Sequence, residues 1–179
     1  MPELIPPNVR VHTSFLQAMD EFRAEGRAAT ADTSMIGREI RTYGDTWDDP
    51  LVFARYCSEL IAGARPDTPR LEGWVLSTTL WYVDGEKYLG RLAIRHTLTP
   101  TLLEIGGHIG YDVRRTARRR GHATAMLRDA LPETHALGID PALVTCDTDN
   151  VGSRKVIEAC GGVLEDQRQG KLRYWVPTA

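Results

Sequence analysis

The chain has 179 residues, 42% of them hydrophobic and 26% charged, a composition typical of one globular domain with a sizeable core. Its 22 basic and 24 acidic side chains give a net charge of −2, which argues against general binding to nucleic acid. No apolar run is long enough to span a bilayer and the first residues show no leader-like pattern, so we expect a cytoplasmic protein without a membrane partner.

The three cysteines do not have the spacing of a zinc site or of a disulfide framework. Cys57, Cys146 and Cys160 each stand among apolar or small residues. We therefore expect free thiols and no bound metal.

The first 70 residues predict helices around one stretch that is hard to interpret. After a short strand-like piece at 8–12, residues 13–25 carry apolar side chains at helical spacing, with Thr13 or Ser14 as the cap and Gly26 as the end. Residues 27–49 favour a loop or a broken helix. Residues 50–62 resume a helical period after an Asp-Pro start signal.

From residue 75 onward the pattern changes to strands. Two β-branched or aromatic runs between residues 77 and 98 are joined through Asp84 and Gly85, a hairpin signal. Residues 102–113 predict a further strand, interrupted by Gly106, Gly107 and Gly110. Glycines within a strand indicate a bulge or a group that approaches the backbone closely.

The last third predicts a helix, a strand, a second helix and two paired strands. A helical pattern runs from residue 122 to Gly138, although Pro132 should kink or restart it. An apolar strand at 141–150, a helix from residue 151 closed by Gly161 and Gly162, and strands at 162–167 and 171–177 follow. The strand after the helix requires a parallel neighbour, so the fold class is α+β with a mixed sheet in a single domain, 1–179.

Five arginines stand together directly before the long helix: Arg114, Arg115, Arg118, Arg119 and Arg120. They can be a solvated basic surface or a nucleic-acid patch. They can also belong to a site for a phosphorylated ligand, since the unpaired N–H groups at a helix start bind anions.

The surrounding residues favour the phosphate site. Arg118, Gly121 and Ala123 fill a (Q/R)-x-x-G-x-(G/A) motif between the strand HIGYDV and the helix, and the next helix starts near Asn150 and Ser153. This order resembles the GNAT superfamily of acyl-CoA-dependent N-acetyltransferases. The resemblance covers residues 71–176 as an acyl-CoA-binding core, while residues 1–70 resemble the variable acceptor-side region in element order alone.

The resemblance implies a mostly antiparallel central sheet, flanked by helices, whose fourth and fifth strands splay apart. Acetyl-CoA would be the cosubstrate, with its pyrophosphate on the main-chain amides of residues 119–124 and its pantetheine arm along the fourth strand. Arg119 stands where the family often has glycine, so we expect its side chain to face solvent. The implied cofactor-binding residues are Tyr111, Asp112, Val113, Arg118, Arg119, Arg120, Gly121, His122, Ala123, Thr124, Asn150 and Ser153.

An amine acceptor, with a pKa of about 10.4, is mostly protonated at neutral pH and needs a general base. His108 and Glu104 are the candidates, because residues four apart on a strand share a face. His108 is preferred for its ordinary pKa of about 6.5, and His96 is a weaker candidate. A hydrogen-bonded structural role for the histidine and a solvated role for Glu104 are the alternatives.

The sequence departs from the family pattern at Ile157, where many members have a tyrosine that protonates the leaving thiolate. Water or another group such as Tyr174 would have to replace it. The prediction is an N-acetyltransferase that acts by direct attack in a ternary complex on a primary amine of an unidentified small molecule or protein. A catalytically weak acyl-CoA sensor is the alternative, and the terminal strands leave a homodimer possible.

Overall fold

Seven strands form one sheet in the order β1-β2-β3-β4-β5-β7-β6 in the computed structural model, which describes residues 1–179. All neighbours are antiparallel except β4 and β5, which run parallel. The predicted mixed, mostly antiparallel sheet is therefore confirmed. The strands are β1 (Glu3–Ile5), β2 (Ser77–Asp84), β3 (Lys87–Arg95), β4 (Ile109–Val113), β5 (Ala142–Asp147), β6 (Val163–Arg168) and β7 (Lys171–Val176).

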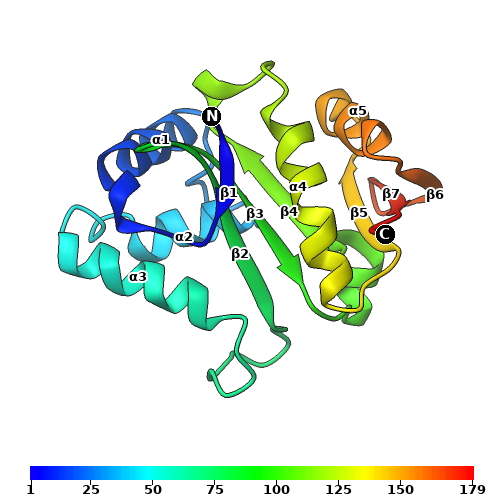
Figure 1. Cartoon of the computed structure of the whole chain (residues 1–179), viewed down its shortest axis with the longest axis horizontal. Coiled ribbons are helices and arrows are strands. Elements are labelled where there is room, and N and C mark those ends of the chain that lie inside the picture. The colour runs from blue at the N-terminus through cyan, green and yellow to red at the C-terminus, as the bar shows by residue number, and fades with distance from the viewer.

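Helices cover both faces of the sheet (Figure 1). One core packs α1, α2 and α3 against side chains such as Trp81 and Val83, and the other packs α4 and α5 against their neighbours Leu80 and Tyr82. Alternate residues of β2 thus enter different cores. The helices are α1 (His12–Ala24), α2 (Met35–Tyr43), α3 (Pro50–Ala62), α4 (His122–Ala136) and α5 (Val151–Ala159), with shorter turns η1 (Val9–Val11), η2 (Leu102–Gly106) and η3 (Arg115–Ala117).

Side-chain caps start two of the first three helices. The Asp49 carboxylate accepts from the N–H of Leu51 at 2.8 Å, with Pro50 in the first turn, and the Ser34 hydroxyl accepts from Gly37 in α2. Neither Thr13 nor Ser14 caps α1, contrary to expectation. The Ser14 hydroxyl instead accepts from the N–H of Tyr88 in β3 at 3.0 Å, which ties α1 to the sheet.

Four other expectations from the sequence are wrong. Residues 35–43, expected within a loop or a broken helix, form a regular helix, and residues 9–11 form a 3₁₀ turn instead of a strand. The stretch 102–106 is a π-helical turn, which ends where Gly107 adopts a φ of 68°, so the fourth strand is only five residues long. Pro132 lies inside α4, which runs unbroken for 15 residues.

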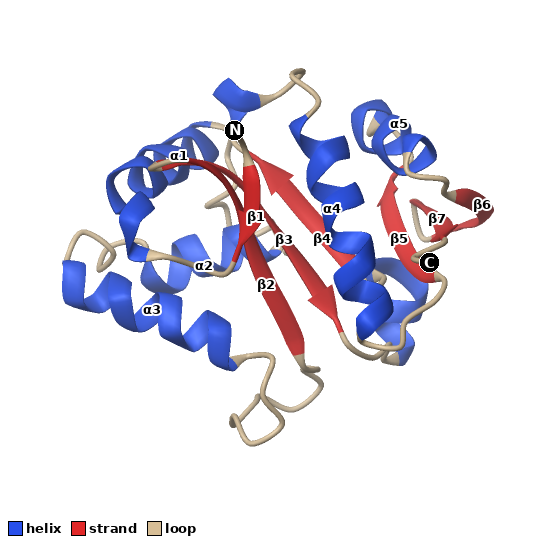
Figure 2. Cartoon of the chain, viewed as in Figure 1, coloured by secondary structure: helices blue, strands red, loops and turns tan.

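The sheet is split between β4 and β5. Their only paired residues are Ile109 and Val144, whereas β4 makes five such pairs with β3 and β5 makes six with β7. Beyond that pair the two strands diverge toward their carboxyl ends, and α4 and α5 lie above the gap (Figure 2). The expected splaying of the fourth and fifth strands is confirmed.

Candidate active site

The edge of β4 facing the split carries unpaired main-chain groups. The N–H of Arg114 donates to Leu89 and the N–H of Arg95 donates to His108, so even-numbered residues of β4 bond to β3. The odd-numbered Tyr111 and Val113 therefore direct their N–H and C=O groups toward the split, where β5 does not pair with them. This edge can accept an added, extended ligand.

The start of α4 opens beside the same gap. Gly121 precedes the helix with a φ of 80°, and a Cβ placed on it would meet no atom within 4 Å. The first helical bond runs from Ala125 to Gly121, so the N–H groups of His122, Ala123 and Thr124 have no acceptor within the helix. These free donors and the helix dipole favour an anion at this position.

Arg119 is exposed and has a φ of 60°, a conformation that favours glycine. This backbone requirement accounts for the glycine often found at the position. The expected solvent-facing side chain is confirmed.

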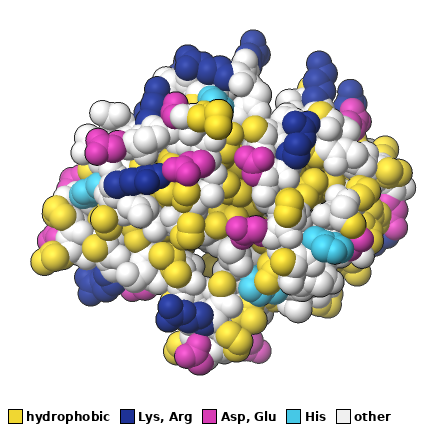
Figure 3. Space-filling model, viewed as in Figure 1, with side chains coloured by type: hydrophobic (Ala, Val, Ile, Leu, Met, Phe, Trp, Pro, Cys, Tyr) yellow, Lys and Arg dark blue, Asp and Glu magenta, His cyan; other side chains and the backbone are white.

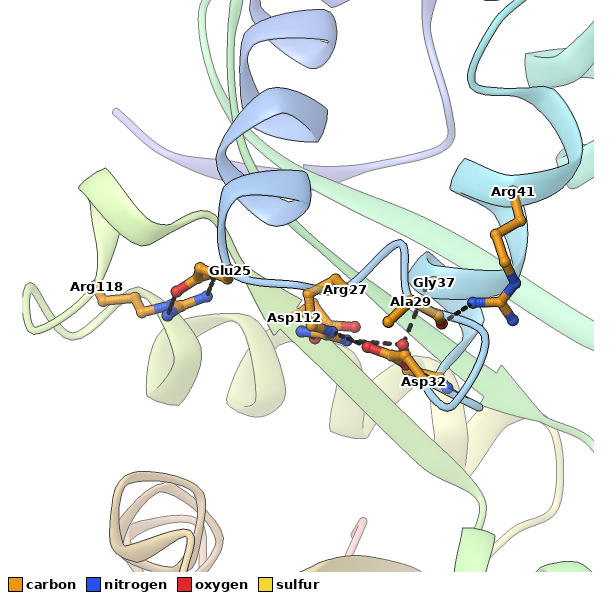
Figure 4. Close-up of polar contacts among 9 residues, drawn as sticks. Glu25, Arg27, Ala29, Asp32, Gly37, Arg41, Asp112 and Arg118 are labelled. Carbon is orange, nitrogen blue, oxygen red and sulfur yellow. Dashed lines mark hydrogen bonds and ion pairs between the residues drawn. The ribbon is translucent and has the colours of Figure 1, made fainter.

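The arginine cluster divides into fixed and free members. Arg114 is buried and bonds to Glu21 of α1, while Arg118 forms a two-point ion pair with Glu25, the residue that follows the last turn of α1 (Figure 4). Arg118 also donates to the carbonyl of Val113 at 2.9 Å. Contrary to expectation, the Arg118 guanidinium is occupied within the fold and holds the loop before α4.

The free cations surround the opening of the split. Arg115, Arg119 and Arg120 are exposed before α4, and Lys155 is exposed on α5 across the gap, next to Arg154, which pairs with Glu158 at 3.8 Å. Figure 3 shows Lys and Arg side chains along the upper edge of the molecule, over these elements. A phosphate-rich ligand would find positive charge on both sides.

A tyrosine and a serine meet across the split. The Asn150 side chain accepts from the N–H of Ser153 and caps α5, and the Ser153 hydroxyl lies 2.7 Å from the phenol oxygen of Tyr111 on β4. Burial raises the pKa of Tyr111, partly offset by its bond to Ser153, so the phenol keeps its proton at neutral pH. From the sequence Tyr111 is expected to contribute main-chain groups, whereas its side-chain pair with Ser153 is not predictable, because nothing in the sequence places residues 111 and 153 in contact.

Neither position 157 nor Tyr174 provides a free proton donor here. Ile157 is fully buried in the core, and the Tyr174 hydroxyl donates to Glu158 at 3.1 Å.

His108 is part of the junction between β4 and β5. Its main-chain N–H donates to the carbonyl of Leu143 at 2.7 Å, and its ring Nδ1 accepts from the Leu143 N–H at 2.9 Å. Burial, with the positive charge of Arg95, lowers the pKa of His108. The lone pair that a general base would use is therefore engaged, and the geometry favours the structural alternative for this residue.

The sequence predicts that Glu104 and His108 lie on one strand, and this prediction is wrong. Glu104 lies in η2, half-exposed, and its carboxylate accepts from Arg168 at 2.7 Å. The π-helical turn removes the two-residue periodicity on which the pairing of Glu104 with His108 was based. The weaker candidate, His96, lies 2.8 Å from the hydroxyl of Thr78.

Asp112 differs from its two neighbours on β4. Its main chain pairs with Arg91 of β3, so it cannot present groups to the split as expected. Its carboxylate accepts from Arg27 at 2.9 Å, and Arg27 also bonds to Asp32, which ties the loop after α1 to β4 (Figure 4). Burial raises the pKa of Asp112, partly offset by Arg27.

Metal ligands and membrane spans are also absent from the described chain. No group of three or more His, Cys, Asp or Glu side chains is placed to hold a metal ion, and the three cysteines are free. None of the helices combines the length and the apolar character that crossing a membrane requires.

Comparison with known proteins agrees with this geometry. The model of the acetyltransferase (GNAT) domain family matches residues 29–163. No curated protein sequence matches the chain. Because the family match covers more than half of the chain, the protein belongs to the GNAT family and is an acyltransferase.

Solved structures show the same fold at low sequence identity. RimJ from Mycobacterium smegmatis, in complex with a CoA disulfide, superposes with a TM-score of 0.66 at 18% identity, covering 98% of this chain and 81% of its own. The microcin C7 self-immunity acetyltransferase MccE, in complex with acetyl-CoA and AMP, gives 0.64 at 12% identity, covering 98% and 92%. RimL, a ribosomal protein α-N-acetyltransferase in complex with coenzyme A, gives 0.62 at 13% identity, covering 99% and 95%.

Proposed function

We propose that this protein transfers the acetyl group of acetyl-CoA to a primary amine in a ternary complex. The observation that carries the proposal is the open split between β4 and β5 beside the uncapped start of α4. Residues 71–176 would bind the cosubstrate, and residues 1–70 would form much of the acceptor side.

The amides of residues 119–124 would bind the pyrophosphate. A single helix-end charge contact contributes about 0.3 to 1 kcal/mol, whereas micromolar affinity needs about 8 kcal/mol, so several amides must act together. The free cations, such as Arg119 and Arg120, would guide the phosphates and contact them at the solvent-exposed rim.

The pantetheine arm would lie in the split and pair with β4. Tyr111 offers N–H and C=O groups there, whereas Val113 offers its N–H because its carbonyl already accepts from Arg118. The thioester would then lie near the junction of Ile109 with Val144, where the gap closes.

In the reaction the amine nitrogen attacks the thioester carbonyl, the new N–C bond forms, and the C–S bond breaks to leave a thiolate. The hydrogen-bonded Tyr111 and Ser153 hydroxyls lie in the split and would donate the proton that the thiolate needs.

Neither predicted base, His108 nor Glu104, is free to accept the amine proton, since each is engaged by the bonds described above. The proton would therefore leave through water. Deprotonating an amine of pKa about 10.4 at neutral pH costs about 4 to 5 kcal/mol. On this proposal kcat/KM rises with pH up to the pKa of the acceptor amine, and therefore to a different value for each amine. If kcat/KM instead became constant below pH 7, at the same pH for every amine, an enzyme group such as His108 would be the base.

Two matched glycine variants test the cofactor site by calorimetry. Gly121 and Gly138 lie next to opposite ends of α4 with φ of 80° and 79°, and neither has an atom within 4 Å of its Cβ position. Gly121→Val should abolish acetyl-CoA binding, because a branched side chain is strained there and fills the space of the phosphates. Gly138→Val should carry a similar strain and bind normally. Equal binding by both variants would contradict the site.

The acyl-CoA sensor remains a second candidate, since Ile157 stands where a proton-donating tyrosine is common in the family. An assay of thiol release over a panel of amines separates the two functions. Binding of acetyl-CoA without release of thiol for any amine would favour the sensor.

A further inference from the structure

A guanidinium without a counter-ion lies on the acceptor face of the split. The two terminal nitrogens of Arg95, at the end of β3, are 3.7 Å from the Cβ position of Gly110 in β4. Its Nη1 donates to the carbonyls of Gly106 and Gly107 at 3.1 Å each. Its Nε and Nη2 have no acceptor in the protein and are not sealed from solvent, so they can bind a ligand.

Other positive charges reinforce this site, and no carboxylate neutralises it. No Asp or Glu oxygen lies within 4.0 Å of Arg95 or of Arg38 in α2. The carboxylate next to Arg38, that of Glu39, is already bonded to Arg91 and to the Tyr56 hydroxyl. Burial and the charges of Arg38 and Arg91 lower the pKa of Arg95, which nevertheless stays charged at neutral pH.

Arg38 is held in place without an ion pair. Its guanidinium lies 5.0 Å from the ring centroid of Trp74, a cation–π contact, and its side chain is exposed. Arg38 therefore keeps free donors, and its charge acts on Arg95, whose pKa it helps to lower.

Arg95 lies on the side of the sheet from which we expect the acceptor amine to approach the thioester. Gly110 follows Ile109, the residue at the closed end of the split, near which the thioester would lie. Tyr111 packs into the core beneath α4 and α5, so Gly110 faces the opposite side, that of α1 to α3. An amine that approaches the thioester from this side passes Arg95.

Building on the proposed function, we infer that Arg95 and Arg38 bind a carboxylate that the acceptor carries close to its reacting amine. The planar fork of a guanidinium matches a carboxylate, and unpaired positive charge repels a polyamine. Two sources share this chemistry: a free amino acid, and a peptide whose N-terminal residue is acidic.

Matched acceptors that differ in one charge test the inference. Glycine, alanine and serine are compared with their amides, and an Asp-Ala-Ala amide is compared with an Asn-Ala-Ala amide. We expect kcat/KM at least tenfold higher for the carboxylate member of one of these sets, and the set that shows the preference identifies the source. Equal use of acid and amide, or a preference for spermidine, would overturn the inference.

Substitutions of the two arginines test whether they cause the preference for a carboxylate-bearing acceptor. Arg38→Gln should reduce the acid-to-amide ratio about tenfold, mainly through KM, while acetyl-CoA affinity stays unchanged. Arg95→Gln should reduce it further, although it also removes the two bonds to the carbonyls of Gly106 and Gly107, so Arg38→Gln is the cleaner variant. Arg65→Gln, at an exposed arginine outside any ion pair, is the control. An unchanged ratio in Arg38→Gln would contradict the assignment.

A binding measurement separates this inference from the proposed function. Acetate, a carboxylate without an amine, is titrated into the CoA-loaded protein while NMR follows the arginine Nε–H signals. A saturable shift of the Arg95 signal that weakens in Arg38→Gln supports the carboxylate site even if no amine is acetylated. No shift of that signal would overturn it, whatever the activity. Failure to bind acetyl-CoA would instead contradict the proposed function.

Discussion

At the scale of single residues, backbone conformation decides which side chains border the proposed cofactor site. Arg119 and Gly121 both have positive φ, 60° and 80°, so the loop before α4 turns its amides toward the split. Only one of these positions is glycine. The other carries a strained residue, whose exposed charge is useful at the rim of a phosphate site.

Replacement of Arg119 separates the strain from the charge. Arg119→Gly and Arg119→Ala both remove the cation, but only glycine relieves the positive φ. We expect the free energy of unfolding of Arg119→Gly to exceed that of Arg119→Ala by about 1 kcal/mol, measured in urea. Both variants should bind acetyl-CoA a few-fold more weakly than the native protein. Equal stability of the two would show that the loop relaxes.

The lowered pKa of His108 predicts how the free energy of unfolding depends on pH. This pKa is lowered in the folded chain, first by burial and then by Arg95, whereas in the unfolded chain His108 protonates near pH 6.5. Below that value the unfolded state binds more protons, so the free energy of unfolding falls as the pH drops toward the folded pKa.

His108→Asn should remove this contribution and flatten the stability curve below pH 6.5. It should cost less than about 1 kcal/mol above that pH, because the asparagine Oδ1 can replace Nδ1 as the acceptor for the Leu143 N–H. Chemical denaturation from pH 5 to 8 measures both effects, and His96, whose pKa is also lowered, remains unchanged in the comparison. An identical pH dependence in the two proteins would exclude His108 as the cause.

At the scale of elements, α1 holds the loop between β4 and α4. Glu21 and Glu25 lie one helical turn apart and bind Arg114 and Arg118 on that loop. The pairs differ in burial: the side chains of Glu21 and Arg114 are 17% and 6% exposed, and those of Glu25 and Arg118 are 23% and 41%. The helix α1 thus fixes the geometry of the loop before α4.

The two glutamates should therefore contribute unequally to stability. Glu21→Gln leaves a buried guanidinium without its ion pair and should cost about 3 kcal/mol, whereas Glu25→Gln should cost less than about 1 kcal/mol. Urea denaturation of the two variants checks this contrast. Similar losses would mean that exposure does not control the strength of these pairs.

At the scale of the whole molecule, the split leaves one strand edge unpaired inside an otherwise continuous sheet. The main-chain N–H and C=O groups along this edge of β4 have no partners in the sheet, and a bound ligand can supply them. Two cores on opposite faces keep the sheet intact on either side of the gap.

Hydrogen exchange should detect the alternation along β4. In the free protein the amides of Tyr111 and Val113 should exchange faster than that of Asp112, which bonds to β3. Saturation with acetyl-CoA should slow Tyr111 and Val113 and leave Asp112 nearly unchanged. Uniform protection of all three residues in both states would contradict the proposed path of the pantetheine arm.

Much of the fold could be predicted from the sequence by itself, because the relevant signals are local. Asp49 and Pro50 mark the start of α3, Asp84 and Gly85 mark the hairpin, and the apolar period marks α4. The motif at 118–123, with the strand before it and the strand after it, indicated the GNAT family and hence the split sheet, both of which are confirmed. The π-helical turn at 102–106 was not predictable, since its apolar residues fit a strand equally well.

Only the tertiary structure decided which side chains are free. The sequence places Arg114 and Arg118 in a cationic cluster, but their partners lie more than 90 residues away on α1. Likewise, Tyr111 meets Ser153, and His108 binds Leu143, only after the sheet has formed. Hydrogen bonds and ion pairs between distant segments depend on three-dimensional proximity, which local sequence patterns do not encode.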